Sequence, residues 1–416
     1  WGAMAARLAA GLLLWLCSGC AWASRGAEER DGRELSVAPR RPRTELERAV
    51  RLERRRQRDG GGGSRCEVEG WSIEPRCRRT LPCDLRAYDP GASFHRDVID
   101  KSRPREWAKN NVDAPNRFFQ NGIEWWLHRA LPPATSNVSA LEGAQRVFVT
   151  AYFSYMFIFA PHKVEPALTA IRKGLGHQWV SNPRHFIVAH GHPGACVPGT
   201  ASATRLLVDD CSSCSHSRAY IAVPYVVARP SWLVAPDPPP NTNRSLLLFF
   251  RGHLPKGYIE SASIRRRMLQ ALRGLPGVLI EASTSQPGAV YEPHSLYLKK
   301  MLSAKFCLTP RGDTSSSKRT YESIAAGCIP VIIADDLRLP FSRKLNWDSF
   351  SIRISEKEAL RDPPAIVQRL HNLPPARVVA MQAALARARP NFLWHLDPSR
   401  RSAVDAILEE ICDGPE

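Results

Sequence analysis

The chain has 416 residues, enough for two ordinary domains. Charged residues make up 24% and hydrophobic residues 44% of it, which is the balance of a folded chain and not of a disordered one. That composition excludes a collagen, a coiled coil and a protein with many membrane spans. The 58 Lys and Arg exceed the 40 Asp and Glu by 18, which favours an acidic partner. The alternative is that the excess of arginine only reflects a GC-rich coding sequence.

Residues 1–23 have the pattern of a secretory leader. Arg7 precedes an uncharged apolar stretch, and small residues then end in an A-x-A site at Ala23. An uncleaved signal anchor is the alternative, although a span usually needs about 20 apolar residues and this stretch is shorter. Both alternatives predict a Golgi or secretory-pathway lumen location, in the second case as a single-pass type II membrane protein.

Two further features agree with a luminal location. Asn137 and Asn243 each begin a glycosylation sequon. Most of the 11 cysteines should form disulfides in an oxidising lumen. Cys211 and Cys214, followed by His216, have a zinc-like spacing, but no second pair after the leader has it, so a disulfide or a loop is preferred to a zinc site.

The composition divides the chain into segments. Residues 24–65 form a basic low-complexity stem, for which a polyanion-binding arm is the alternative interpretation. The texture after it predicts a first domain over 66–235, a second over 241–395 and a C-terminal tail or helix over 396–416, with a proline-rich connection between the domains.

Apolar runs separated by turn signals predict the elements of both domains. In the first domain we expect strands at 146–153, 185–190 and 220–227 and a helix at 164–174. In the second we expect strands at 246–250, 278–280, 305–308 and 328–334, alternating with helices at 263–272, 294–303 and 319–326, and closing helices at 363–370 and 374–388. Strands that are apolar on both faces and alternate with helices indicate an α/β fold with parallel sheets.

The segment from Phe306 to Arg319 has the most informative pattern. A strand leads into a polar loop with Ser315 and Ser316, and a helix begins near Arg319. Unpaired N–H groups at a helix start and an arginine suit a diphosphate, and Glu322 could accept the hydroxyls of a ribose. The alternative is that the serines cap the helix and Glu322 pairs with Arg319 on the surface.

A second basic group follows the strand at 246–250. Arg251 stands where this strand stops at a glycine, and Arg265 begins the next helix. Both could reach a diphosphate at the carboxyl edge of the sheet. A solvated basic helix face is the alternative for most of the three consecutive arginines at 265–267.

These motifs, with Gly327-Cys328-Ile329-Pro330-Val331 and the later Leu339-Pro340-Phe341 and Trp347-x-x-Phe350, resemble the donor-site signature of the exostosin-type glycosyltransferases, family 47. The resemblance is strongest over 305–358. It implies a GT-B architecture, in which two Rossmann-like domains face each other across a cleft. It also implies transfer of a sugar from a UDP-sugar, usually with inversion, onto a glycan or polysaccharide.

Carried onto this chain, the resemblance implies that Arg319 contacts the diphosphate and Glu322 the uridine ribose, while Arg251 and Arg265 neutralise phosphate charge. It implies no obligatory cofactor or metal. In agreement, the sequence has no Asp-x-Asp pair to hold a divalent cation, because Asp335 and Asp336 lack the intervening residue. The implied partners are the UDP-sugar donor, a glycan or polysaccharide acceptor, and a homo- or hetero-oligomer with a related transferase. The positive net charge of the chain would suit an acidic acceptor. A leader sequence argues against nucleic acid.

The catalytic base is the open question. The family often has an acid after the strand-end histidine of the first domain, where this chain has Gly191. His190 and His192 are candidates for the base, and a buried structural histidine and a loop histidine are the alternatives. Without a base the chain would be an inactive, glycan-binding or accessory subunit.

Cys307 and Cys328 lie on the two expected strands that flank the helix of Arg319. If these strands are neighbours in the sheet, a disulfide between the two cysteines would brace the donor loop.

Overall fold

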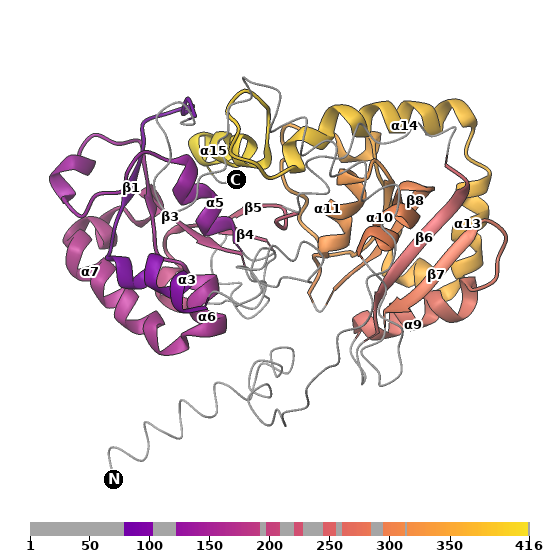
Figure 1. Cartoon of the computed structure of the whole chain (residues 1–416), viewed down its shortest axis with the longest axis horizontal. Coiled ribbons are helices and arrows are strands. Elements are labelled where there is room, and N and C mark those ends of the chain that lie inside the picture. The colour runs from indigo at the N-terminus through magenta and orange to yellow at the C-terminus, as the bar shows by residue number, and fades with distance from the viewer. Residues whose placement is uncertain are drawn as a thin grey trace, which may run out of the picture. The chain divides into compact units, whose positions relative to one another are not determined.

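The computed structural model describes residues 79–102, 122–191, 197–208, 220–227, 244–254, 260–283, 294–312 and 314–414. They form two α/β domains, each on a five-stranded sheet whose strand pairs are parallel (Figure 1). This confirms the predicted α/β class with two parallel-sheet domains, whereas the GT-B arrangement of the two domains across a cleft stays a prediction. The leader, the stem, His192, Asn243 and the Cys211–His216 cluster lie outside the described residues.

The N-terminal sheet places its strands in chain order, β1-β2-β3-β4-β5. Its strands are β1 (Leu85–Tyr88), β2 (Arg146–Val149), β3 (Phe186–His190), β4 (Thr204–Leu207) and β5 (Tyr220–Ala222). Its helices are α3 (Arg96–Ser102), α5 (Ile123–Ala130), α6 (Phe153–Phe159) and α7 (Val164–Ser181), with 3-10 turns η2 (Ala92–Phe94), η4 (Val138–Leu141), η5 (Pro161–Lys163), η6 (Pro183–His185) and η7 (Pro198–Thr200). Because all five strands are parallel, their carboxyl ends meet at one edge of the sheet.

Two expected strands of this domain are shorter in the structure. The strand expected over 146–153 ends at Val149, and Phe153 begins α6. An apolar run that is buried throughout does not distinguish a strand from a helix. The run at 220–227 is a strand only to Ala222, and Pro224, which has no N–H to donate to a ladder, follows closely.

The C-terminal sheet has the order β10-β9-β8-β6-β7. Its strands are β6 (Leu246–His253), β7 (Val278–Ser283), β8 (Ala304–Pro310), β9 (Ile329–Ile333) and β10 (Ile352–Arg353). Its helices are α9 (Glu260–Leu272), α10 (His294–Leu302), α11 (Lys318–Ala325), α12 (Glu356–Arg361), α13 (Pro363–His371) and α14 (Pro375–Ala388), with 3-10 turns η10 (Trp347–Ser349) and η11 (Arg389–Phe392). The chain runs from β6 outward to β7 and then back past β6 to β8, so the strand order reverses between β6 and β8.

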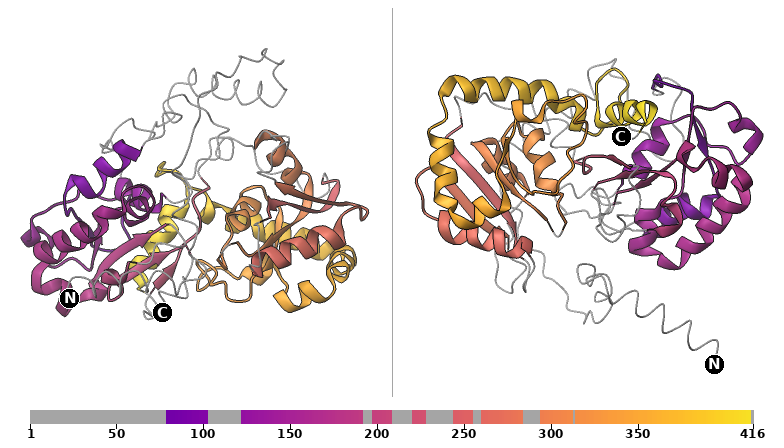
Figure 2. Two further views of the ribbon diagram at one scale, coloured as in Figure 1. Left: turned by 90° about the horizontal axis from the view of Figure 1, so that it is seen from below. Right: turned by 180° about the vertical axis from the view of Figure 1, so that it is seen from behind.

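This reversal places helices on both faces of the C-terminal sheet, as the views in Figure 2 show. Right-handed crossovers in opposite directions put α9 on one face and α10 and α11 on the other. In agreement, α9 packs against α12 and α13, whereas α10 and α11 pack on β8. The crevice at such a reversal, outside the carboxyl ends of the strands, is where open α/β sheets bind ligands.

A buried arginine holds α11 to this sheet. The Arg244 guanidinium donates to the backbone oxygens of Ala304, at the start of β8, and Ala326, at the end of α11, each at 2.8 Å. Burial lowers the pKa of Arg244 to about 10, which still leaves it charged at neutral pH. Gly327, with φ 63, then turns the chain into β9.

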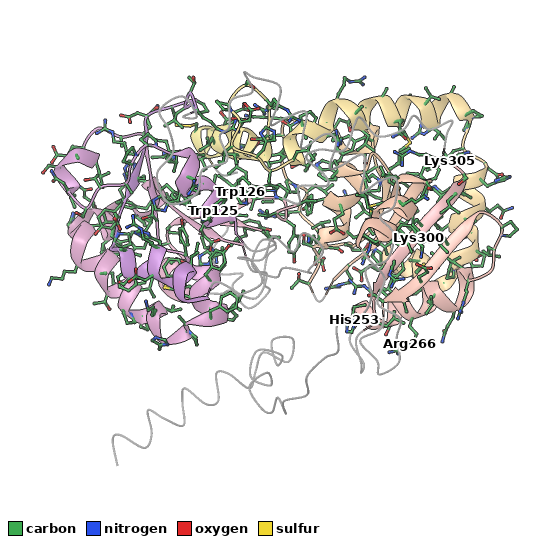
Figure 3. The ribbon with its side chains drawn as sticks, in the orientation of Figure 1. Trp125, Trp126, His253, Arg266, Lys300 and Lys305 are labelled. Atoms are coloured by element: carbon green, nitrogen blue, oxygen red, sulfur yellow. A yellow bond between two sulfur atoms is a disulfide. The ribbon has the colours of Figure 1, made fainter. Side chains whose placement is uncertain are left out.

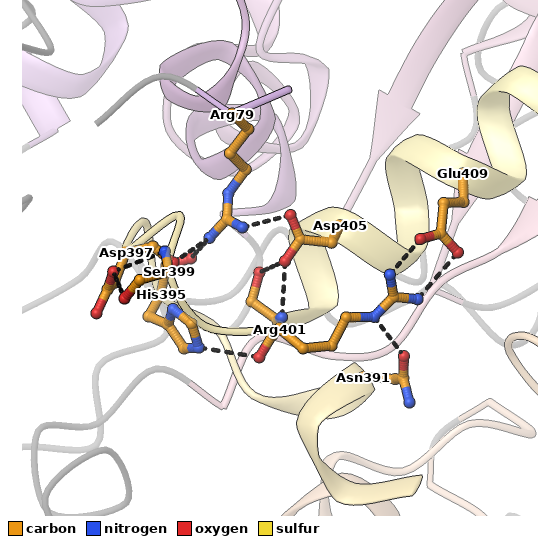
Figure 4. A network of polar contacts seen from close by, with 9 residues as sticks. Arg79, Asn391, His395, Asp397, Ser399, Arg401, Asp405 and Glu409 are labelled. Atoms are coloured by element: carbon orange, nitrogen blue, oxygen red, sulfur yellow. Dashed lines mark hydrogen bonds and ion pairs between the residues drawn. The ribbon is translucent and has the colours of Figure 1, made fainter. Parts of the chain in front are cut away.

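The C-terminal segment returns to the N-terminal domain. Helix α15 (Ala403–Asp413) packs against α5, and a disulfide joins Cys412 to Cys83, just before β1. Beside it, the Arg79 guanidinium pairs with Asp405 and donates to the backbone oxygen of His395 at 2.8 Å (Figure 4). The segment expected as a C-terminal tail or helix is therefore a structural part of the N-terminal domain.

Candidate functional site

The strand reversal in the C-terminal sheet gathers several of the residues expected at a donor site. Strand β6 ends in Gly252 and His253, and β8 ends at Pro310 with Gly312 two residues beyond. Helix α11 begins after the loop that follows β8. Figure 3 shows His253 at this end of β6, with Arg266 of α9 nearby.

Arg319, in the first turn of α11, extends over the end of β6. Its guanidinium carbon lies 4.7 Å from the centre of the Phe250 ring. A Cβ at Gly252 would lie 2.6 Å from Arg319 Nη2, so this position has room for the guanidinium only because it is glycine. The strand end and the aromatic ring therefore fix a cation at the point where strand order reverses.

Arg265 approaches the same edge from α9. It is buried, and its Nη1 donates to the backbone oxygen of His253 at 3.0 Å. Gly312 packs against the backbone of the loop and near this arginine. A Cβ at Gly312 would lie 2.8 Å from the backbone oxygen of Ser316 and 3.7 Å from Arg265 Nη2. A side chain at this position would therefore clash with the backbone of Ser316.

Glu322 lies one turn into α11 and has two partners. Its Oε2 accepts a hydrogen bond of 2.8 Å from the Tyr297 hydroxyl, and its Oε1 lies 3.5 Å from Lys318 Nζ. Burial, and then the nearby Glu322 charge, raise the pKa of Tyr297 well above its ordinary value, so this phenol keeps its proton to donate. Tyr297 has no distinctive signal in the sequence, because an aromatic residue in an amphipathic helix is typical of a core.

The two loop serines differ in position. Ser316 is buried, with 1% of its surface exposed, whereas Ser315 is half-buried. The geometry thus favours a structural contribution from Ser316 to the closed loop. Donation to a ligand by either hydroxyl stays a prediction.

Arg251 lies on the opposite face of β6 from Phe250, because successive side chains on a strand alternate between its two faces. Its Nη1 lies 3.1 Å from Glu281 Oε2 on β7, and Lys300 Nζ of α10 lies 2.8 Å from the same atom. Burial raises the pKa of Glu281, but the bonds from Lys300 and Arg251 outweigh it and hold the pKa below its ordinary value. The structure therefore places Arg265, Arg319 and Glu322 on elements that meet at the strand reversal, whereas Arg251 pairs with an acid on β7.

Beneath the loop, the structure contains the disulfide expected between Cys307 and Cys328, with the two Cα atoms 5.8 Å apart. Cys307 pairs in register with Pro330, so β8 and β9 are neighbours, as the disulfide requires. The bridge joins the strands before and after α11 and limits their separation.

In the N-terminal domain, His190 lies inside the fold. It is 2% exposed, its Nε2 is 3.1 Å from Thr200 Oγ1, and its ring stacks on Phe153. Burial, with the charge of Arg205, lowers its pKa to about 3. A neutral, enclosed imidazole agrees with the alternative of a buried structural histidine. The burial of His190 argues against its contact with a substrate and therefore against its role as the catalytic base.

Glu124 of α5 is a second buried titratable group near the end of β3. Its Oε1 accepts a 2.9 Å hydrogen bond from the backbone N–H of Ser154, and Ser154 Oγ accepts one of 2.6 Å from Gly191. Burial raises the pKa of Glu124 to about 7, against the lowering effect of these hydrogen bonds.

This raised pKa predicts a pH-dependent stability. Between pH 4.5 and about 7 the native state holds a proton that the unfolded chain loses, so stability falls as pH rises through this window. The full penalty above it is about 3 kcal/mol. Glu124→Gln removes the penalty, so urea unfolding should show the variant gaining relative to wild type between pH 5 and pH 8. An equal difference at both pH values would show that Glu124 does not titrate in this range.

The described residues also bear on glycosylation, metal binding and membrane insertion. Asn137 is exposed and caps η4, its Oδ1 accepting from the N–H of Ser139, so its glycosylation stays a prediction. Within the described ranges there is no group of three His, Cys, Asp or Glu side chains placed to hold a metal ion. Across those same ranges no helix has both the length and the hydropathy for crossing a membrane.

The chain is similar in sequence to plant proteins named as probable glycosyltransferases. It is 26% identical over 341 residues to a rice (Oryza sativa subsp. japonica) protein named as a probable glucuronosyltransferase, covering 73% of this chain and 77% of that one. It is 33% identical over 154 residues to an Arabidopsis thaliana protein named as a probable beta-1,4-xylosyltransferase, covering 36% of this chain and only 34% of the relative. Among solved structures, an O-GlcNAc transferase mutant of Thermobaculum terrenum matches with a TM-score of 0.34 and 12% identity, over 88% of this chain and 73% of that one.

A family model covers the greater part of the chain. The exostosin GT47 domain matches residues 88–370, which include strands β2 to β10 and the Arg319–Glu322 site. The match covers the segment over 305–358 where the sequence resemblance is strongest and most of the N-terminal domain as well. The chain therefore belongs to the exostosin GT47 family of glycosyltransferases.

Proposed function

We propose that the chain transfers a sugar from a UDP-sugar, with inversion, onto a glycan or polysaccharide in the secretory pathway. The observation that carries the proposal is the convergence of Arg319, Arg265 and Glu322 at the strand reversal of the C-terminal sheet. Two cations and one acid there match a nucleoside diphosphate, which has a charged end and a ribose with two hydroxyls.

The two arginines have a direct role in such a reaction. When the bond between the sugar and the β-phosphate breaks, negative charge develops on the leaving UDP. Preformed positive groups stabilise that charge without reorganising at the moment of reaction. The ring of Phe250 and the backbone oxygen of His253 hold Arg319 and Arg265 in place before any ligand arrives. These cations supply the stabilisation that a metal supplies in other sites, so we propose no obligatory cofactor.

Glu322 is proposed to bind the ribose. The Tyr297 hydroxyl orients the carboxylate through Oε2, and Lys318 balances its charge. A carboxylate held in this way can accept from both ribose hydroxyls, which distinguishes a nucleotide from inorganic pyrophosphate.

The names of similar proteins, the net charge and the disulfides support a donor class, an acidic acceptor and a compartment. Relatives are named as glucuronosyl-, xylosyl- and arabinosyltransferases, so the corresponding UDP-sugars are the first donors to test. The net charge of +18 favours an acidic acceptor. A Golgi or luminal location is supported by two disulfides in the described chain, because such bonds persist in oxidising compartments.

The test is a screen of UDP-sugars with released UDP as the readout, in the presence and absence of oligosaccharide acceptors. We expect acceptor-dependent release with at least one UDP-uronic acid or UDP-pentose. Binding of UDP without turnover of any UDP-sugar would support an accessory subunit instead, a role that Gly191 in place of the family's acid favours. No binding of UDP at millimolar concentration would contradict both functions.

A further inference from the structure

A polar cluster at the carboxyl edge of the N-terminal sheet has no assigned role. Asp89 directly follows β1, His95 follows η2, His128 lies on α5 and Tyr152 follows β2. The ends of β1 and β2 are neighbours, since Tyr88 pairs in register with Val149. These four residues, here called the edge cluster, lie at the edge where a parallel α/β sheet binds its ligands.

Asp89 is fixed through one carboxylate oxygen only. Its Oδ1 accepts hydrogen bonds from the backbone N–H of Gly91 at 2.7 Å and from His95 Nε2 at 2.9 Å. Its Oδ2 forms no hydrogen bond with any residue that the structure describes. The side chain is 31% exposed, so Oδ2 is available to a ligand. The bond from His95 holds the pKa of Asp89 below its ordinary value, against the effect of partial burial.

The residues behind Asp89 hold His95 in position. The His95 side chain is 5% exposed and packs edge-on against His128, with ring centres 5.1 Å apart, and against Tyr152. His128 Nδ1 is 2.9 Å from the Tyr152 hydroxyl. Burial, and then the His95 charge, lower the pKa of His128 to about 3, so it is neutral beside the pair. Within the edge cluster, His95, His128 and Tyr152 thus support one partly exposed carboxylate, that of Asp89.

Other acids and bases at this edge do not face solvent in the same way. Glu124 and His190 are 0% and 2% exposed, so neither can touch an acceptor without a rearrangement of the fold. Gly191, where the family often has an acid, offers only its backbone, and its N–H is already bonded to Ser154 Oγ. Among the described residues at the ends of β1, β2 and β3, Asp89 combines partial exposure with an unoccupied carboxylate oxygen.

We propose that Asp89 is the catalytic base of the transfer and that His95 is its positioning residue; this rests on the proposed function. Asp89 Oδ2 takes the proton from the acceptor hydroxyl while the hydroxyl oxygen bonds to C1 of the donor sugar. The bond from C1 to the β-phosphate oxygen breaks, and its electron pair leaves with UDP, whose charge Arg319 and Arg265 meet. A carboxylate performs the same proton transfer from water in inverting glycosidases.

Asp89→Asn is the direct test. The amide oxygen of asparagine can still accept from Gly91 and His95, so the turn after β1 is conserved while the base is lost. We expect the rate of sugar transfer to fall by about 10²- to 10⁴-fold, with the Kd for UDP and the thermal midpoint unchanged. Asp84→Asn is the matched control, because Asp84 precedes the same strand at its other end and pairs with Arg86. It should transfer sugar as wild type does.

His95→Ala and His95→Gln test the positioning role. The alanine variant should lower kcat with little change in the KM for donor, and the glutamine variant, which can still donate to Oδ1, should recover part of the loss. Asp89→Asn with wild-type kcat would overturn the assignment of Asp89 and leave the donor site intact. A wild-type chain that binds UDP but transfers no sugar would overturn the proposed function and Asp89 as its base together. Loss of UDP binding or of folding in Asp89→Asn would also overturn the assignment of Asp89 as the base, in favour of a structural role for this residue.

Discussion

Arg319→Ala is expected to weaken UDP binding roughly a hundredfold, by about 3 kcal/mol, because truncating one partner of a charge-assisted contact costs about 2–5 kcal/mol. Arg319 is the cation held over the end of β6 by the Phe250 ring and given room by Gly252. Calorimetric titration with UDP measures the loss.

Uridine and Arg266→Ala serve as controls for this prediction. Uridine lacks the diphosphate, so its affinity should be the same in wild type and Arg319→Ala, whereas Glu322→Gln should weaken both ligands. Arg266 is one residue from Arg265 on α9 and is half-buried, so its removal changes net charge without removing the proposed contact. Equal losses of UDP affinity in Arg319→Ala and Arg266→Ala would show that the loss comes from the change in net charge and not from a direct contact between Arg319 and UDP.

Removal of the Cys83–Cys412 disulfide, as Cys83→Ser with Cys412→Ser, should produce the largest loss of stability. The bond closes a loop of 329 residues, and the chain-entropy relation gives about 6 kcal/mol for a loop of that size. It also holds α15 against the N-terminal domain together with the Arg79–Asp405 pair. Guanidinium unfolding followed by circular dichroism should show the lower midpoint.

The second disulfide provides the comparison. Cys307 and Cys328 are 21 residues apart, for which the same relation gives about 3 kcal/mol. Their removal should cost less stability overall but should loosen the strands on either side of α11 and so affect UDP binding. A larger loss of stability from the Cys307 and Cys328 pair than from Cys83 and Cys412 would contradict this ranking.

The C-terminal domain could be predicted from sequence almost completely. Its strands are apolar on both faces and its helices have clear amphipathic periods, so local pattern and tertiary burial agree. The loop after β8 and the positions of Arg265, Arg319 and Glu322 followed from that alternation. The direction of Arg251 did not, because its ion pair with Glu281 depends on the register of β6 with β7, which no local pattern encodes.

The N-terminal domain was predicted less well. Strands β1 and β4 have four residues each, and β4 contains a buried arginine, Arg205, so neither has a distinctive apolar period. Helix α5 was missed, and with it Glu124 and His128. The edge cluster is assembled from four separate segments, so only the fold shows that Asp89 and His95 lie in contact with each other and near Tyr152.

A crystal structure of the chain with UDP bound would show directly whether the strand reversal of the C-terminal sheet is the donor site. We expect the diphosphate at Arg319 and Arg265, at the reversal between β6 and β8, and the ribose hydroxyls at Glu322. UDP bound in the cluster of Arg251, Glu281 and Lys300 instead, or elsewhere in the fold, would contradict it.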